Sequence, residues 1–457
     1  MLIPLQLPPG VHANGTEFES SNRWREASLV RWHDGSMRPV GGWTVRKSSA
    51  FAYAPRAMIS YLDNDSDEHM AAGTYEKLYY VNPALTVTDI TPSSGFTSGT
   101  LNGALNLGYG GGFMGATNYG RAPTSSGVYA EATTWSLDTW GEYLLGVSST
   151  DGKLLEWQGN PSANAAVVAN APVDNLAMVV TEERFVFCLG AGGNPRKVAW
   201  SDKEDNTSWT AAATNEAGDM ELQTNGQIMC GVRMRGATLI LTSEDAHLAT
   251  YSGAPFVYGF QRVGTACGIA SRKAAVAIDE GAFWMGKKGF FTFNGSTATE
   301  ISCEVADYVF DDLNPSQVSK VYAVHNSQFG EIWWFYPSSS ATENDRYVTL
   351  DYKEGHWATG VIDRTAGVDQ GIFVNPIWAD ASGNLYNHET GYTHGSVKPY
   401  AESGSISLGN GDNIMKVNKL IPDERTQGQV EVTFKTRFHP NDTETSHGAY
   451  TLSNPTD

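Results

Sequence analysis

The chain has 457 residues, a length that suits two to four domains or one large all-β body. Charged residues make up 18% and aromatic residues 11% of the sequence, which excludes a disordered or coiled-coil chain. The net charge of −19, from 50 acidic and 31 basic residues, repels a phosphate backbone, so ordinary sequence-reading DNA binding is excluded.

Residues 1–55 are predicted to form an N-terminal platform or assembly segment. Their first ten residues are rich in proline and lack the basic start of a signal peptide. No window of the chain supplies the ~18 unbroken apolar residues of a spanning helix, so no membrane insertion is expected.

The stretch 29–43 holds four candidate interface residues that offer ion-pair and aromatic contacts to a partner. They are Arg31, Trp32, Arg38 and Trp43. Gly41 and Gly42 would let another backbone approach closely. The alternative is that these tryptophans only pack a first blade or a small platform.

One pattern recurs from residue 56 to residue 400. It is an apolar, aromatic-rich strand, a turn of Gly, Asp, Asn or Ser, and a second strand that ends near Trp or Tyr. The copies are 70–80, 143–157, 185–200, 238–251, 282–293, 332–352 and 377–386. Apart from one long gap they begin about 40 to 55 residues apart, the repeat length of a four-stranded propeller blade.

Each of these hairpins alone would expose an apolar face, so the copies must pack against one another. That packing would bury Trp200, Trp284, Trp333 and Trp378. The predicted fold is all-β: a β-propeller of about six to seven blades, with a small N-terminal and C-terminal β platform and one short helix. Unrelated hairpins in stacked sandwiches are the alternative.

The long gap holds a glycine-rich insertion at about 93–127 that interrupts the repeat. Four apolar residues in it are candidate anchors on a neighbouring subunit: Tyr109, Phe113, Met114 and Tyr119. Ordering so many glycines is costly without a partner surface, so we expect the insertion to dock the subunit and to contribute little to its own fold. A plain surface loop is the alternative.

One helix is predicted over 304–313, with Ser302 as its N-cap and one apolar face packed on the propeller. Beyond residue 400, alternation over 414–420 and 430–438 predicts two half-buried strands. Residues 401–457 are therefore expected to close the last blade or to complete the platform.

The sequence offers no pattern for catalysis or for a metal. Cys188, Cys230, Cys267 and Cys303 are too widely spaced for a zinc ribbon or a disulfide framework, and are expected to be free thiols buried in strands. Stretches 149–157 and 380–386 resemble sialidase Asp-box turns only partly and are predicted to be ordinary turns. Stretch 63–68 has glutamate where a calcium loop needs glycine, so it is predicted to be a solvated turn. No catalytic residue, metal or cofactor is expected.

Two stretches resemble a virion protein of short-tailed bacteriophages. The first is the opening of the chain, with PPG at 8–10, NGT at 14–16, RW at 23–24 and LVRWHDGSMRPVGGW at 29–43. The second is CEVADYVFDDLN at 303–314, followed by HNSQFGEIWWFY at 325–336 and RYV at 346–348. By architecture these proteins are similar to tail nozzle proteins, β-propeller subunits that form a six-membered ring below the portal adaptor.

The resemblance implies a structural, non-enzymatic component of the virion tail. It implies a homo-hexamer in the virion that contacts the portal adaptor and, as further partners, tail fibres or spikes. Double-stranded DNA would pass through transiently without sequence-specific binding. A receptor-binding adhesin propeller at the tail tip and, less favoured, a polysaccharide hydrolase are the alternatives.

A ring of acidic subunits would give the exit channel a negative potential, which disfavours phosphate adsorption. The candidate channel-lining residues lie in turn-rich connections: Asp202, Glu204, Asp205, Glu216, Asp219 and Glu221. Each of them could instead face the outer solvent.

Overall fold

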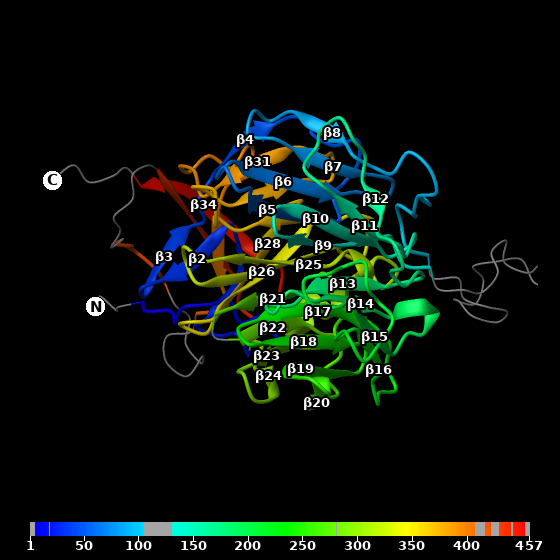
Figure 1. Ribbon diagram of the computed structural model, residues 1–457. Helices are drawn as coiled ribbons and strands as arrows, with labels where there is room; N and C mark the ends of the chain where they lie inside the picture. Colours follow the sequence, from blue (N-terminus) through cyan, green and yellow to red (C-terminus); the bar gives the residue numbers. More distant parts are fainter. Residues whose placement is uncertain are drawn as a thin grey trace, which may run out of the picture.

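The computed structural model describes residues 5–17, 19–104, 130–279, 281–406, 416–421, 429–439 and 442–452. Among them, seven four-stranded antiparallel sheets follow one another as the blades of a propeller (Figure 1). The all-β propeller predicted from the sequence is confirmed, with seven blades.

Six blades are each formed by four consecutive strands. They are β5 (Ala57–Leu62), β6 (Glu68–Gly73), β7 (Leu78–Val81) and β8 (Val87–Asp89); β9 (Trp135–Trp140), β10 (Tyr143–Ser148), β11 (Leu154–Trp157) and β12 (Ala166–Val167); β13 (Ala177–Val180), β14 (Val186–Leu189), β15 (Lys197–Trp200) and β16 (Gly218–Glu221); β17 (Ile228–Met234), β18 (Ala237–Thr242), β19 (Asp245–Gly253) and β20 (Val257–Thr265); β21 (Ala275–Ile278), β22 (Gly281–Met285), β23 (Phe290–Phe293) and β24 (Ala298–Ile301); β25 (Tyr322–Asn326), β26 (Glu331–Tyr336), β27 (Arg346–Asp351) and β28 (His356–Val361). The hairpins predicted from the sequence are the second and third strands of the blades.

The seventh blade joins the two ends of the ring. It consists of β29 (Ala366–Val368), β30 (Ile377–Ala379), β31 (Leu385–His388) and, as its outer strand, β4 (Trp43–Lys47). Of the two alternatives predicted for residues 401–457, closing the last blade or completing the platform, the first does not occur among the described residues. An unpaired outer edge of β31 would expose its backbone donors and acceptors, and β4 covers that edge from the N-terminal segment.

The first strand of each blade is the inner one. The seven inner strands contact one another in order, and β29 contacts β5, so the ring is closed. We call the surface on which the inner strands end the front face; it carries loops 63–67, 141–142, 181–185, 235–236, 327–330 and 369–376. The back face is where the inner strands begin; it carries loops 48–56, 130–134, 168–176, 222–227, 266–274, 302–321 and 362–365.

Both ends of the chain form two-stranded pairs outside the ring. These are β1 (Trp24–Ser28) with β32 (Tyr400–Ser403), β2 (Val30–His33) with β3 (Ser36–Pro39), and β33 (Val430–Thr436) with β34 (Thr445–Leu452). We call these three pairs the platform; β2, β3 and β34 lie on the left of Figure 1, and β1 and β2 contact β28 of the sixth blade.

The strand expected over 430–438 is present as β33. The strand expected over 414–420 is not seen in its described part, because residues 416–421 pair with no strand; residues 414 and 415 lie outside the described residues. These six residues are all exposed, so no packed surface holds them in a sheet.

Between the fifth and sixth blades lies the short helix α1 (Ala306–Asp312), while η1 (Ala191–Gly193) and η2 (Val318–Lys320) are single 3₁₀ turns. The helix begins after Val305 and not after the predicted cap Ser302, and no side chain caps it. Val305 and Val309 are fully buried in the propeller core, as the predicted apolar face requires. Burial of this face therefore holds the helix in place without a polar cap.

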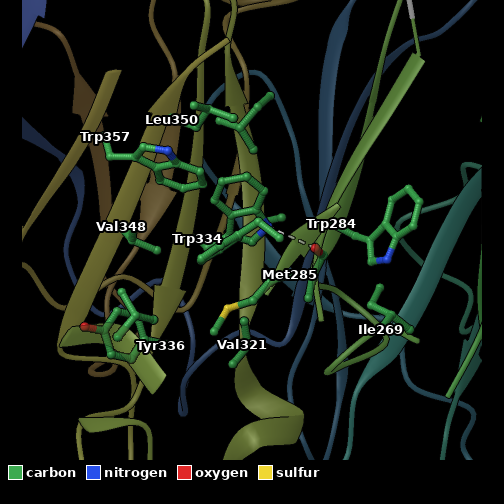
Figure 2. Packing of buried hydrophobic residues seen from close by; sticks show 14 of the residues in the cluster. Ile269, Trp284, Met285, Val321, Trp334, Tyr336, Val348, Leu350 and Trp357 are labelled. Carbon is green, nitrogen blue, oxygen red and sulfur yellow. Dashed lines mark hydrogen bonds between the residues drawn. The ribbon is translucent and has the colours of Figure 1, made fainter. Parts of the chain in front are cut away.

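Tryptophans fill the space between blades. Trp334 and Trp357 of the sixth blade pack on Phe290 of the fifth, and the Trp334 indole donates to the Ala274 carbonyl at 3.0 Å. Trp284, in the same cluster, lies on the other side of the fifth blade beside Ile269 (Figure 2). The four tryptophans predicted to be buried are buried. Because its N–H keeps a hydrogen bond, the buried indole contributes its large apolar surface to the core without leaving a donor unpaired.

Two of the four cysteines depart from expectation. Cys188 and Cys230 are buried in β14 and β17, but Cys267 and Cys303 lie in loops, and Cys303 is only partly buried. All four are free thiols.

The described first part of the glycine-rich insertion belongs to the fold. Phe96 stacks on Trp135 at 5.8 Å between ring centroids, and Gly103 exchanges two hydrogen bonds with the Gln317 side chain. A Cβ on Gly103 would lie 2.3 Å from the Ser316 carbonyl oxygen, so only glycine fits there. The expectation that the insertion contributes little to the fold is thus wrong for residues 95–104. Candidate anchors Tyr109, Phe113, Met114 and Tyr119 lie outside the described residues.

Candidate functional site

The inner strands enclose a cavity of about 410 Å³ along the propeller axis, which we call the channel. Strands β9, β13, β17, β21, β25 and β29 all contribute to its wall. Its charged and titratable residues are Asp138, Cys230, Arg233, Arg272, Lys273, Tyr322, His325 and Asp369.

Towards the front face, opposite charges in the channel are paired. Asp138 lies 3.5 Å from the Arg233 guanidinium and accepts the Val180 N–H at 2.9 Å. Burial raises the pKa of Asp138, and the positive charge of Arg233 opposes that shift. His325 Nδ1 lies 3.3 Å from Asp369; burial lowers the pKa of His325, and Asp369 opposes the change.

Towards the back face, the channel wall is basic. Arg272 is buried and pairs with Glu131, while its Nε has no hydrogen-bond partner among the described residues. The backbone of the next residue, Lys273, is fixed to β25 because its carbonyl accepts the Ala323 N–H at 2.7 Å. Burial lowers the pKa of Lys273, an effect that Cys230 and Asp138 oppose.

This wall does not resemble a catalytic site. Burial raises the pKa of the Cys230 thiol to about 12, so it stays protonated at neutral pH and is a poor nucleophile. The two lining carboxylates are each held by a basic neighbour, Asp138 by Arg233 and Asp369 by His325. Such pairing suits structure or ligand binding more than acid–base chemistry.

The front face is strongly acidic. Its loops carry many more acidic than basic side chains, with Asp63, Asp65, Asp67, Glu142, Glu182, Glu183, Asp202, Glu204, Asp205, Glu216, Asp279, Glu354 and Asp369 against Arg184, Lys203, Arg235 and Lys353. The back-face loops carry acids too, but more lysines and arginines balance them, so the net negative charge is larger on the front face.

The six predicted channel-lining acids separate into two groups. Asp202, Glu204, Asp205 and Glu216 lie together in the front-face loop between β15 and β16. Asp219 and Glu221 lie on β16, the outer strand of the third blade, where they pair with Lys197 at 2.9 Å and Arg196 at 2.5 Å. None of the six lines the propeller's own channel.

Of the front-face group, Glu204 and Asp205 are exposed. Asp202 instead organises its loop, because its carboxylate accepts the backbone N–H groups of Lys203 and Glu216 at 2.9 and 2.8 Å. Glu216 is half-buried and accepts the Tyr251 hydroxyl at 3.1 Å.

Arg31, the first of the predicted interface residues, is buried inside this chain. Its guanidinium binds the Glu331 carboxylate through two hydrogen bonds of 2.8 and 2.9 Å, and it binds Glu389 at 2.6 Å. The guanidinium also lies over the Phe329 ring at 3.7 Å. Arg31 is thus engaged within the subunit and fastens β2 to the front face.

The other three predicted interface residues differ in exposure. Trp32 is buried against Trp24, and Trp43 packs on His388 within the closing blade. The Arg38 side chain, about half exposed, points away from the core on β3. Gly41 approaches a backbone closely, as predicted, but the neighbour is Glu389 of the same chain.

Sequence reasoning missed the acidic partners of Arg31. Glu331 begins β26 and Glu389 follows β31, and both also accept from Asn326. The available signal was a glutamate opening an otherwise apolar run, EIWWFY, where burial of a charge demands a cation.

The turns weighed for chemistry are ordinary turns. The Asp380 carboxylate accepts the backbone N–H groups of Ser382 and Asn384 at 2.9 and 2.8 Å. Asp63 accepts those of Asp65 and Asp67 in the same way. These carboxylates stabilise turns between strands.

One group of possible metal ligands exists among the described residues: His33, Asp34 and Glu354, whose donor atoms lie within 4.8 Å of one another. Asp34 and Glu354 are exposed, and Glu354 already accepts the Asp34 backbone N–H at 2.8 Å. These three residues are therefore not proposed as a metal site. In the described part of the chain, every helix is too short or too polar to cross a lipid bilayer.

The sequence matches no family model and no curated protein. Among solved structures, virginiamycin B lyase from Staphylococcus aureus is similar, with 6% identity, a TM-score of 0.46 and coverage of 76% of this chain and 98% of the lyase. PorZ of the type-IX secretion system of Porphyromonas gingivalis has 9% identity, a TM-score of 0.41 and coverage of 81% and 41%. YCF48 bound to D1 peptide has 9% identity, a TM-score of 0.42 and coverage of 78% and 99%. These likenesses are too weak to bear on function.

Proposed function

We propose that this protein is a structural subunit of the tail of a short-tailed bacteriophage, in the nozzle ring of six copies below the portal adaptor. One observation carries the proposal: the two stretches that resemble phage virion proteins lie far apart in sequence but are bound to each other. Arg31 binds Glu331, and Arg23 binds Glu304 at 2.7 Å. Two motifs that together hold a platform on a propeller fit a nozzle subunit.

The charge distribution supports a passive conduit for DNA. The front face has few basic residues to balance its acids, so in a ring it would present a surface that repels phosphate. DNA could then pass such a ring without adsorbing to it. The proposed location is accordingly the virion tail, and the proposed partners are the portal adaptor and tail fibres or spikes.

The proposal includes the absence of enzymatic activity. Among the described residues, the channel holds no nucleophile within hydrogen-bond reach of a base, and its carboxylates are held by basic neighbours. Release of reducing sugar from host polysaccharide, lost on changing one Asp or Glu, would overturn this part and favour a hydrolase.

Stoichiometry tests the proposal. Because the ring is expected to form on an adaptor template, mass photometry should show monomers of the isolated protein, while quantitative imaging of virions should show six copies. A stable trimer in solution would contradict the nozzle and favour the adhesin.

Arg38 gives a point variant for the same test. Arg38→Glu on exposed β3 should leave the monomer folded but reduce its incorporation into tails. Arg235→Glu, in a front-face loop away from the platform, is the matched control and should assemble normally. Equal incorporation of both variants would argue against contact through β3.

A further inference from the structure

Among the described residues, no counter-charge is bound to the ammonium of Lys273 in the channel. Lys273 lines the channel and lies within electrostatic range of Asp138 and Cys230, which line it too. Its backbone is fixed between blades, because its N–H donates to Ser271 at 3.2 Å and its carbonyl accepts from Ala323. The side chain therefore projects into the channel from a rigid base.

Two acidic groups near this wall are already engaged. Glu131 is bound by Arg272, and Asp138 is bound by Arg233 and two backbone N–H groups. No carboxylate of the described residues lies within ion-pair distance of the Lys273 ammonium. A charge held this deep is costly unless a counter-ion accompanies it.

Arg272, the residue before Lys273, adds a second positive charge to the same wall. It lines the channel, its side chain is 4% exposed, and its guanidinium binds Glu131. Two neighbouring cationic side chains on one wall match the charge of an oxyanion.

We propose that the back-face half of the channel binds a small oxyanion, held by the Lys273 ammonium beside the positive charge of Arg272. The cavity of about 410 Å³ has room for such an ion and its remaining waters. This site is independent of the proposed structural function, and either could fail without the other.

Calorimetric titration of the full chain with inorganic phosphate tests the site, and a parallel titration with acetate shows whether a carboxylate suffices. We expect one saturable site with a Kd of about 1 mM or tighter. Lys273→Met should weaken binding at least about tenfold, whereas Lys273→Arg, which keeps the charge, should retain most of it. Lys287→Met is the control, because Lys287 is exposed and pairs with Glu244 at 3.0 Å on the back face.

A measurement on the unchanged protein covers the case in which the Lys273 variants do not fold. Acetylation footprinting by mass spectrometry should show that phosphate protects Lys273 several-fold and leaves Lys287 equally reactive. Absence of saturable binding by both anions, or binding that neither protects Lys273 nor responds to its replacement, would overturn the proposal.

Discussion

At the residue scale, one buried arginine holds two carboxylates between the platform and the propeller. Arg31, Glu331 and Glu389 are each almost fully buried, and Asn326, the Trp333 indole and the Gly41 N–H supply further donors to the carboxylates. Such a network is not itself strong evidence for stability, because desolvation offsets much of the attraction. The network instead favours this one placement of the platform on the propeller. Removal of the single cation leaves two buried negative charges unpaired.

Arg31→Leu should therefore lower the free energy of unfolding by about 3–5 kcal/mol, the usual cost of breaking a buried ion pair. Thermal and urea denaturation of the variant and of wild type would measure the loss. Arg38→Leu is the matched control, because its half-exposed side chain makes only a 3.9 Å contact with exposed Asp34. A loss no larger than that of the control would mean that the network does not fasten β2.

The stability of the Arg31→Leu variant should also depend on pH. Burial raises the pKa of Glu331, and the Arg31 charge opposes that shift, so removing Arg31 should raise the pKa further. The folded variant then binds a proton that the unfolded chain releases above about pH 4.3, and its stability falls as pH rises through that window. The destabilisation should be smaller near pH 5 than at pH 7.

At the scale of elements, the second and third strands of each blade could be read from the sequence, but the closing strand could not. Hairpins such as 282–293 show their apolar alternation and turn residues locally. Strand β4 pairs with β31 across more than three hundred residues, and its Val45 is largely exposed. A short edge strand with an exposed apolar residue carries no local signal of its partner.

Truncation isolates the contribution of β4. A chain of residues 41–457 keeps β4, and a chain of residues 49–457 lacks it; both lack Arg31 and strands β1 to β3. We expect the shorter chain to melt at lower temperature and to aggregate through the uncovered edge of β31. Calorimetry and light scattering compare the two. Equal melting temperatures would show that the ring does not depend on this strand.

The residues of the candidate site, like the closing strand, could not be predicted from local sequence patterns. Asp138, Arg233 and Lys273 come from three blades, and none belongs to a motif that singles it out. Their convergence follows from the ring, in which every inner strand faces one axis. The acidic loop 202–216 was found from composition alone, but only the order of strands shows that it lies on the front face.

At the scale of the whole molecule, the charge of −19 is distributed unevenly, and this distribution is what the proposed conduit would use. Blades alternate strand direction, so acids in the loops after the first and third strands all reach one face. If this face borders passing DNA, its charge lowers adsorption and so shortens the dwell time of the genome. If it faces outer solvent, its charge only aids solubility.

Neutralising exposed acids on each face separates these two cases. The front-face variant Asp65→Asn, Glu204→Gln, Asp279→Asn and the back-face variant Asp174→Asn, Glu244→Gln, Asp311→Asn each remove three charges from exposed positions. Both should fold and assemble, since most surface substitutions change stability by about 0.5 kcal/mol or less. Phage carrying the front-face variant should eject DNA more slowly, with a larger deficit at low ionic strength, where charge is least screened. Time-resolved fluorescence of released DNA measures the rate; equal ejection by both variants would place the acidic face away from the DNA path.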